Sequence, residues 1–136
     1  FSSIHPFTYT PDQEQAGVEA YHRELADLGG RFDIVLVGCG EDGHIAAIFP
    51  GYHEPESDTE DFLLVRDAPK PPAGRMTASI RLLLRAQVGV GLFFGAEKRN
   101  ALCRLFDESI PVQDCPAKIL RLLPQHYIIT DQEGCP

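Results

Sequence analysis

Residues 32–51, FDIVLVGCGEDGHIAAIFPG, join a short apolar run to a glycine-rich turn. The run FDIVLV at 32–37 is nearly continuous and rich in β-branched residues, which is typical of a strand buried on both faces of a parallel sheet. A short helix is expected at 43–49, where Pro50 and Gly51 stop it. Because open α/β sheets bind ligands beyond the carboxyl ends of their strands, the turn GCGEDGH at 38–44 is the first candidate for a site.

Strand and helix signals alternate on both sides of this segment. Upstream, Thr10 as a cap and Pro11 at the first helical position predict a helix start, and Gly29-Gly30 predicts its end. The apolar face of that helix comprises Val18, Tyr21, Leu25 and Leu28. Downstream, strands are expected at 62–66, 75–79, 88–94 and 127–130, and helices at 80–86, 96–106 and 117–123. This order predicts a single α/β domain over residues 1–136 with a mostly parallel sheet.

The composition is that of one globular domain, with 136 residues of which 43% are hydrophobic. No apolar stretch approaches the roughly 18 residues that cross a bilayer, and no secretory signal opens the chain, so membrane and secreted classes are disfavoured. A formal net charge of -8 disfavours a nucleic-acid partner, because phosphate backbones require a basic face. Four cysteines without metal-ligand spacing are expected to be reduced thiols of a cytoplasmic protein.

Charge is distributed unevenly along the chain. The stretch EPESDTED at 54–61 is predicted to be a solvated surface loop. In contrast, the segment 70–104 contains a single acid, Glu97, and seven bases: Lys70, Arg75, Arg81, Arg85, Lys98, Arg99 and Arg104. An acidic chain thus carries one concentrated basic segment.

The turn at 38–44 also matches the G-x-G-x-x-G pattern of dinucleotide-binding domains, and Asp67 closes the next expected strand. Two acids in the turn, Glu41 and Asp42, would face a pyrophosphate, which disfavours that interpretation. The early stop at Pro50 and the histidine after the last glycine also count against it. Dinucleotide binding is therefore the less favoured alternative for this turn.

His44 is the strongest candidate for a catalytic base. Its expected place at a helix N-terminus keeps the imidazole neutral, so that the ring can accept a proton from water. Asp42, two residues earlier, either orients this ring or caps the helix. A purely structural histidine is the alternative, but His5, His22, His53 and His126 have no comparable setting.

The second expected strand-to-helix turn, GAEKR at 95–99, places two cations at a helix start. Lys98 and Arg99 there oppose the helix dipole, so stability alone would favour acids in their place. An anionic ligand, most economically a phosphate, accounts for the two cations; a solvated Lys-Arg pair is the alternative.

Three blocks of the sequence resemble the signature blocks of the 6-phosphogluconolactonases: residues 32–51, PKPPAGRMT at 69–77 and FGAEKRNAL at 94–102. The resemblance implies a Rossmann-like sheet shared with sugar-phosphate isomerases and CoA transferases. It also implies hydrolysis of 6-phosphoglucono-δ-lactone to 6-phosphogluconate in the oxidative pentose phosphate pathway. In this family pattern His44 matches the catalytic base and Lys98 matches a phosphate ligand.

The expected mechanism requires neither metal nor cofactor, because a lactone is already electrophilic. His44, oriented by Asp42, takes a proton from the attacking water. Lys98, with Arg75 or Arg99, holds the phosphate of a small phosphorylated sugar lactone. Gly40 and Gly43 are expected to line the substrate-binding site. The backbone N–H groups around Gly40 are the candidates for stabilising the oxyanion that develops at the lactone carbonyl.

The family resemblance also leaves alternatives. Glucosamine-6-phosphate deaminases share Asp-Gly-His-Ile-Ala but carry a catalytic Glu just before Pro-Gly, where this chain has Phe49. Ile45, in contrast, departs from the lactonase pattern, since lactonases usually have Thr at this position. The family's first half, with a Ser-Gly-Gly phosphate loop, has no counterpart, so the native polypeptide is expected to extend upstream of Phe1. A non-catalytic sugar-phosphate-binding fragment is therefore the remaining alternative.

Overall fold

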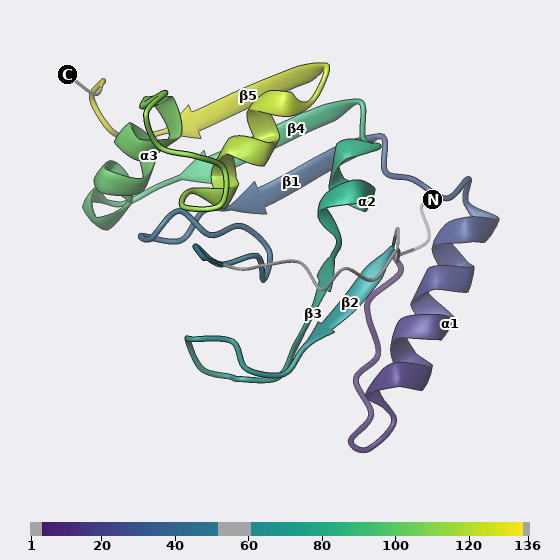
Figure 1. Cartoon of the computed structure of the whole chain (residues 1–136). Helices are drawn as coiled ribbons and strands as arrows, with labels where there is room; N and C mark the ends of the chain where they lie inside the picture. The colour runs from purple at the N-terminus through teal and green to yellow at the C-terminus, as the bar shows by residue number, and fades with distance from the viewer. Residues whose placement is uncertain (1–3, 52–60, 135–136) are drawn as a thin grey trace.

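The computed structural model describes residues 4–51 and 61–134. Its helices are α1 (Glu14–Asp27), α2 (Ile80–Leu84) and α3 (Arg99–Phe106), with 3-10 helices η1 (Ala96–Lys98) and η2 (Pro116–Leu122). Its strands are β1 (Ile34–Gly38), β2 (Phe62–Val65), β3 (Arg75–Ala78), β4 (Val88–Phe93) and β5 (Gln125–Thr130) (Figure 1). Of the predicted acidic loop, residues 54–60 lie outside the described residues. Within the described residues, no helix combines the length and apolar character needed to cross a bilayer.

Three of the strands form a parallel sheet in the order β1-β4-β5. The register pairs Gly38 of β1 with Leu92 of β4, and Leu92 with Ile129 of β5, so the carboxyl ends of the strands lie at one edge. Figure 1 shows that the chain leaves β1 and β4 at this same edge. The predicted α/β class with a parallel sheet is confirmed, while β2 and β3 form a separate antiparallel hairpin.

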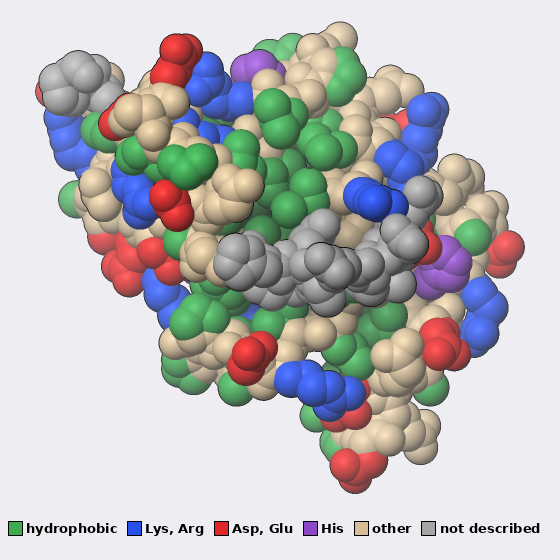
Figure 2. Space-filling model, viewed as in Figure 1, with side chains coloured by type: hydrophobic (Ala, Val, Ile, Leu, Met, Phe, Trp, Pro, Cys, Tyr) green, Lys and Arg blue, Asp and Glu red, His purple; other side chains and the backbone are tan. Residues whose placement is uncertain are grey.

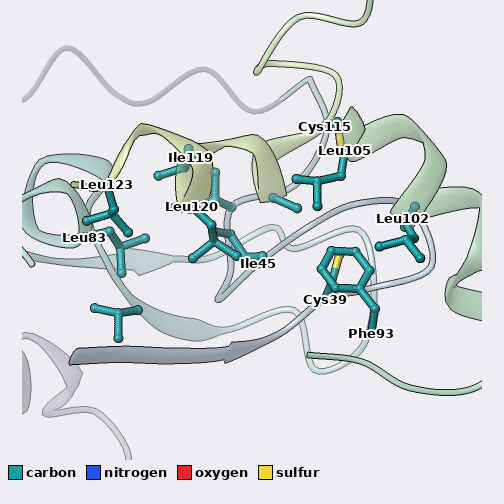
Figure 3. Packing of buried hydrophobic residues seen from close by; sticks show 14 of the residues in the cluster. Cys39, Ile45, Leu83, Phe93, Leu102, Leu105, Cys115, Ile119, Leu120 and Leu123 are labelled. Atoms are coloured by element: carbon teal, nitrogen blue, oxygen red, sulfur yellow. The ribbon is translucent and has the colours of Figure 1, made fainter. Parts of the chain in front are cut away.

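The main core lies between this sheet and the helical segments that cover one of its faces. The 3-10 helix η2 packs against β4, β5, α2 and α3, and Phe93, Leu105 and Ile119 are fully buried there. Figure 3 shows that Cys39 and Ile45, from the turn after β1, join the same cluster. The turn that was expected to carry the chemistry is therefore anchored in the core.

The other face of the sheet is uncovered in the described part of the chain. Ile34 and Leu36 of β1 are each 63% exposed, and Tyr127 and Ile129 of β5, on the same face but separated from β1 by β4, are 57% and 46% exposed. The expectation that 32–37 is buried on both faces is therefore wrong. The cause is that α1 packs against β2 rather than against the sheet.

The first helix begins later than its cap signal predicted. Asp12 has a positive φ of 62°, and the Gln13 N–H donates to the Thr10 carbonyl, so residues 10–13 form a turn. Helix α1 starts at Glu14 with no side-chain cap, and Thr10 is not its N-cap. The end is as predicted, since Gly29 and Gly30 both have positive φ.

Figure 2 shows no single basic surface on the face that it draws. There, Lys and Arg side chains are interspersed with Asp and Glu side chains. The cysteines also differ from expectation, because Cys103 is disulfide-bonded whereas Cys39 and Cys115 are free and buried. The expectation of reduced thiols is wrong for Cys103, since pairing depends on which thiols the fold brings within bonding distance and not on sequence spacing.

Candidate active site

The turn after β1 is a compact loop and not the start of a helix. Gly43 and Ala46 adopt positive φ values of 90° and 52°, which interrupt a right-handed helix. Instead, Ile45 forms isolated bridges with Cys39 and with Ile48. The predicted helix at 43–49 is therefore wrong, and with it the argument that a helix dipole keeps His44 neutral.

Asp42 fixes the orientation of the His44 ring. Its Oδ1 atom lies 2.6 Å from Nδ1 of His44 and accepts a hydrogen bond from the His44 main-chain N–H at 3.2 Å. This pairing places the proton of a neutral ring on Nδ1 and leaves Nε2 as the basic nitrogen. The His44 side chain is 17% exposed, so the ring is held and is still open to solvent.

Gly40 makes room for the ring. A Cβ atom at position 40 would lie 2.0 Å from Nδ1 of His44 and 2.7 Å from Oδ1 of Asp42. The Gly40 N–H donates to the His44 carbonyl at 2.8 Å, and the Gly43 N–H donates to the Gly40 carbonyl at 3.0 Å. These two N–H groups hold the loop together and are already engaged in hydrogen bonds.

Phe49 lies against His44, at the position where the deaminase pattern has a carboxylate. The two rings are 4.6 Å apart between centroids, and Phe49 is buried. On the Phe49 ring lies the guanidinium of Arg75, 5.4 Å from the centroid. The imidazole of His44 therefore has an apolar ring beside it, in the place where the deaminases have a carboxylate.

Arg75 itself is occupied by the loop between β2 and β3. Its Nη2 atom donates to the carbonyls of Lys70 and Pro71, and its Nε atom donates to the carbonyl of Pro72, all at 2.9–3.1 Å. In the described structure Arg75 thus organises residues 70–72. Its expected contact with substrate phosphate is not tested by this arrangement.

Lys70 reaches the turn from that loop. Its Nζ atom lies 3.1 Å from Oδ2 of Asp42 and 3.2 Å from Oε1 of Glu41. Asp42 therefore has His44 on one carboxylate oxygen and Lys70 on the other. Partial burial opposes ionisation of Asp42, but the hydrogen bonds from His44 and Lys70 outweigh it and lower its pKa to about 2.

The second turn begins beside the first. The Cys39 N–H donates to the Leu92 carbonyl at 3.0 Å, and Gly95 then leads into η1 and α3. Lys98 ends η1 and is partly buried, and the exposed Arg99 begins α3. The single helix predicted over 96–106 is thus divided into a 3-10 turn and an α-helix, with the two cations at the junction. Burial raises the pKa of the Cys39 thiol to about 12 with help from Cys115, while the charge of Lys98 opposes the shift. Lys98 is therefore electrostatically coupled to the turn that carries His44.

An acid lies at the start of this second turn. Both carboxylate oxygens of Asp131 accept the Gly95 N–H, at 3.1 Å each. That N–H is consequently not available to an anion in this structure. Among the described residues, no group of three or more His, Cys, Asp or Glu side chains has the arrangement of a metal site.

Sequence reasoning missed Lys70, Arg104 and Asp131 as neighbours of the site. Arg104 of α3 donates to the Asp42 carbonyl at 3.3 Å and to the Asp114 carbonyl at 2.6 Å, which ties the turn to the helix. Lys70 and Arg104 belong to the basic segment, and that segment was the available signal. Its spacing does not indicate which of seven bases would fold back onto the turn.

Comparisons with known proteins agree with this fold. The sequence model of the family described as glucosamine-6-phosphate isomerases/6-phosphogluconolactonase matches residues 2–128. A 6-phosphogluconolactonase of Borreliella burgdorferi is 31% identical over 96% of this chain and 55% of its own length. The solved 6-phosphogluconolactonase of Trypanosoma brucei is 28% identical, with a TM-score of 0.66, over 90% of this chain and 52% of that chain.

A solved monomeric glucosamine-6-phosphate deaminase has a TM-score of 0.67 over 88% of this chain and 54% of that chain. At 24% identity this likeness shows a shared fold only. In all three comparisons the chain spans about half the length of the relative that it matches.

Proposed function

The chain belongs to the glucosamine-6-phosphate isomerase/6-phosphogluconolactonase family, and from this membership we propose that the native protein is a 6-phosphogluconolactonase. Its reaction is the hydrolysis of 6-phosphoglucono-δ-lactone to 6-phosphogluconate, a step of the oxidative pentose phosphate pathway. The observation that carries the proposal is the pairing of Asp42 with His44 on a turn at the carboxyl edge of the sheet. Oδ1 of Asp42 lies 2.6 Å from Nδ1 of His44.

His44 is the general base in this proposal. With Nδ1 directed at Asp42, Nε2 takes a proton from water as the water oxygen attacks C1 of the lactone. The bond between C1 and the ring oxygen then breaks, and the imidazolium returns the proton to that oxygen. Asp42 holds the ring in this tautomer and stabilises the imidazolium through its negative charge.

The basic turn supplies the recognition of phosphate. Lys98, with Arg99 or Arg75, holds the phosphate group, and Gly40 and Gly43 line the space beside the ring. Binding energy at a phosphate remote from C1 is used to orient the reacting carbon. The two turns follow paired parallel strands, β1 and β4, and the Cys39 N–H donates to the Leu92 carbonyl, which supports a common site for the two turns.

Phe49 favours the lactonase over the deaminase and isomerase alternative. Proton transfer between aldose and ketose forms needs an additional acid or base at the reacting carbons. The deaminase pattern supplies a Glu immediately before Pro-Gly for this purpose. Here the buried ring of Phe49 occupies that position and packs on His44. Hydrolysis of a lactone needs one general base and a positioned phosphate.

The test is a direct assay of the native protein on freshly made 6-phosphoglucono-δ-lactone, with the spontaneous rate subtracted. We expect hydrolysis well above that rate, and we expect the same rate after treatment with EDTA. Turnover of glucosamine 6-phosphate in place of the lactone would favour the deaminase alternative. Phosphosugar binding without turnover of either compound would favour the non-catalytic alternative.

A further inference from the structure

We infer that Lys70 is a positioning residue for the catalytic pair, acting through Asp42 and not on the substrate. The inference rests on the proposed function of His44 and Asp42. It assigns to the Pro-rich loop between β2 and β3 the task of holding one carboxylate oxygen so that the other stays on the imidazole.

The contacts of the Asp42 carboxylate divide between its two oxygens. Oδ1 lies 2.6 Å from Nδ1 of His44, and Oδ2 lies 3.1 Å from Nζ of Lys70. A carboxylate held at both oxygens cannot rotate away from the ring without losing a charge-assisted hydrogen bond. The Asp42 side chain is partly buried, which makes the loss of an ionic partner more costly than at an open surface.

The loop that carries Lys70 is itself fixed to the site. Arg75 donates to the Lys70 carbonyl at 2.9 Å while its guanidinium lies over the ring of Phe49. Phe49 in turn packs on His44. Lys70 and the imidazole are therefore held to each other by two routes, one through the carboxylate of Asp42 and one through Arg75 and Phe49.

Several charged or titratable groups surround the pair from the elements packed against it. They are Glu41 in the turn, Lys70 and Arg75 on the hairpin, Arg104 on α3, Lys98 before α3, and the buried thiols of Cys39 and Cys115. Burial raises the pKa of both thiols, so they are neutral near pH 7. Of the four cations, Lys70 is the one whose charged atom contacts the Asp42 carboxylate.

Removal of the Lys70 charge has a predictable effect on the pH–rate profile. The Lys70 ammonium disfavours a second positive charge on the nearby ring of His44. In Lys70→Met we therefore expect the acidic limb of the kcat profile to move to higher pH by about half a unit. We also expect kcat to fall about tenfold with KM nearly unchanged, because positioning acts on the chemical step. Lys70→Arg, which keeps the positive charge, should restore most of kcat and return the acidic limb of the profile toward its parent position.

The matched control is Arg66→Met, which removes a cation from the exposed residue directly after β2. It should leave kcat and the profile as in the parent protein. A Lys70→Met variant whose KM rises for the phosphorylated lactone, with an unmoved profile, would show that Lys70 binds substrate and would overturn the inference.

A second measurement decides the inference even if the proposed function fails. The titration of the His44 ring, followed by 15N NMR in the native protein and its Lys70→Met variant, needs no turnover. The same spectra report which nitrogen of the neutral ring carries the proton: loss of the Nδ1-protonated form in Lys70→Met supports the positioning role, and its retention contradicts it. Absence of lactone hydrolysis by the parent protein would instead overturn the proposed function.

Discussion

At the scale of the single residue, the imidazole of His44 is distinguished from the other histidines by its partner and its setting. His44 has a carboxylate on one ring nitrogen, aromatic packing on its face and partial access to solvent. His5 and His22 also have carboxylate partners, Glu24 and Asp61, but they lie on the N-terminal segment and on α1, away from the carboxyl edge of the sheet. A carboxylate partner alone therefore does not identify the base.

The first prediction concerns this base. His44→Ala should lower kcat/KM for 6-phosphoglucono-δ-lactone by about 10²- to 10⁴-fold, the usual contribution of a general base. His126→Ala, at an exposed histidine on β5, is the control and should behave as the parent protein does. Retention of most of the activity by His44→Ala would exclude the proposed role.

The second prediction concerns the proposed phosphate ligand. Lys98→Ala should raise KM for the phosphorylated lactone much more than for unphosphorylated gluconolactone, because only the former loses a charge-assisted contact of about 1.5–3 kcal/mol. The exposed Arg31, before β1, provides a control as Arg31→Ala. Equal effects of Lys98→Ala on both substrates would contradict the assignment.

The third prediction follows from the pKa of Asp42. That pKa is about 2 in the folded protein and ordinarily about 3.8, so folding is stabilised above pH 4 and the stabilisation is lost as the pH falls toward 2. Its size is about 2 kcal/mol at most. Urea unfolding should therefore show Asp42→Asn to be less stable than the parent protein at pH 7, with a smaller difference at pH 2.5.

Asp67→Asn, at an exposed carboxylate outside the turn, serves as the comparison for that experiment and should show little pH-dependent difference. A difference between Asp42→Asn and the parent protein that is the same at both pH values would contradict the third prediction.

At the scale of the element, the turn at 38–44 depends on a missing side chain. In Gly40→Ala the new methyl group would meet the ring of His44 and the carboxylate of Asp42, so the pair must move apart. We expect a loss of about 1–3 kcal/mol of stability together with loss of activity. Gly38→Ala is the matched control, since a Cβ atom there meets nothing within 4 Å. Equal stability and activity of the two variants would argue against this close packing.

Most elements could be predicted from local pattern, and the failures have local causes. Strands β2, β3, β4 and β5 lie at or within two residues of their predicted ranges. The helix predicted at 43–49 fails because Ala46, a good helix former, adopts a left-handed conformation that the bridges of Ile45 impose. The helix predicted at 117–123 is the 3-10 helix η2, shifted by one residue.

At the scale of the whole molecule, the described chain leaves one apolar face of the parallel sheet exposed to solvent. Apolar side chains of β1 and β5 are exposed on one face of the sheet, on either side of β4, and β1 is an edge strand of the sheet in the described part of the chain. Contiguous exposed apolar surface next to an open edge promotes association.

The fifth prediction concerns this face. The polypeptide 1–136 made by itself should self-associate in sedimentation velocity, and Ile34→Thr combined with Ile129→Thr should shift it toward the monomer while keeping good strand formers. Ile4→Thr changes an exposed isoleucine outside the sheet and should have no such effect. Equal association of all three polypeptides would exclude the face as the cause.

By itself, the sequence determined the α/β class, the two turns at strand ends, and the choice of His44, Asp42 and Lys98 as candidates. These depend on local periodicity and on residue types within a few positions of each other. Only the tertiary structure decided that Lys70 and Arg104 contact the turn, that the N–H groups of Gly40 and Gly43 are already hydrogen-bonded, and that one face of the sheet is exposed. Lys70 and Arg104 lie 28 and 62 positions from Asp42 in the sequence. Contacts over such separations are set by packing of the whole chain, which no local pattern records.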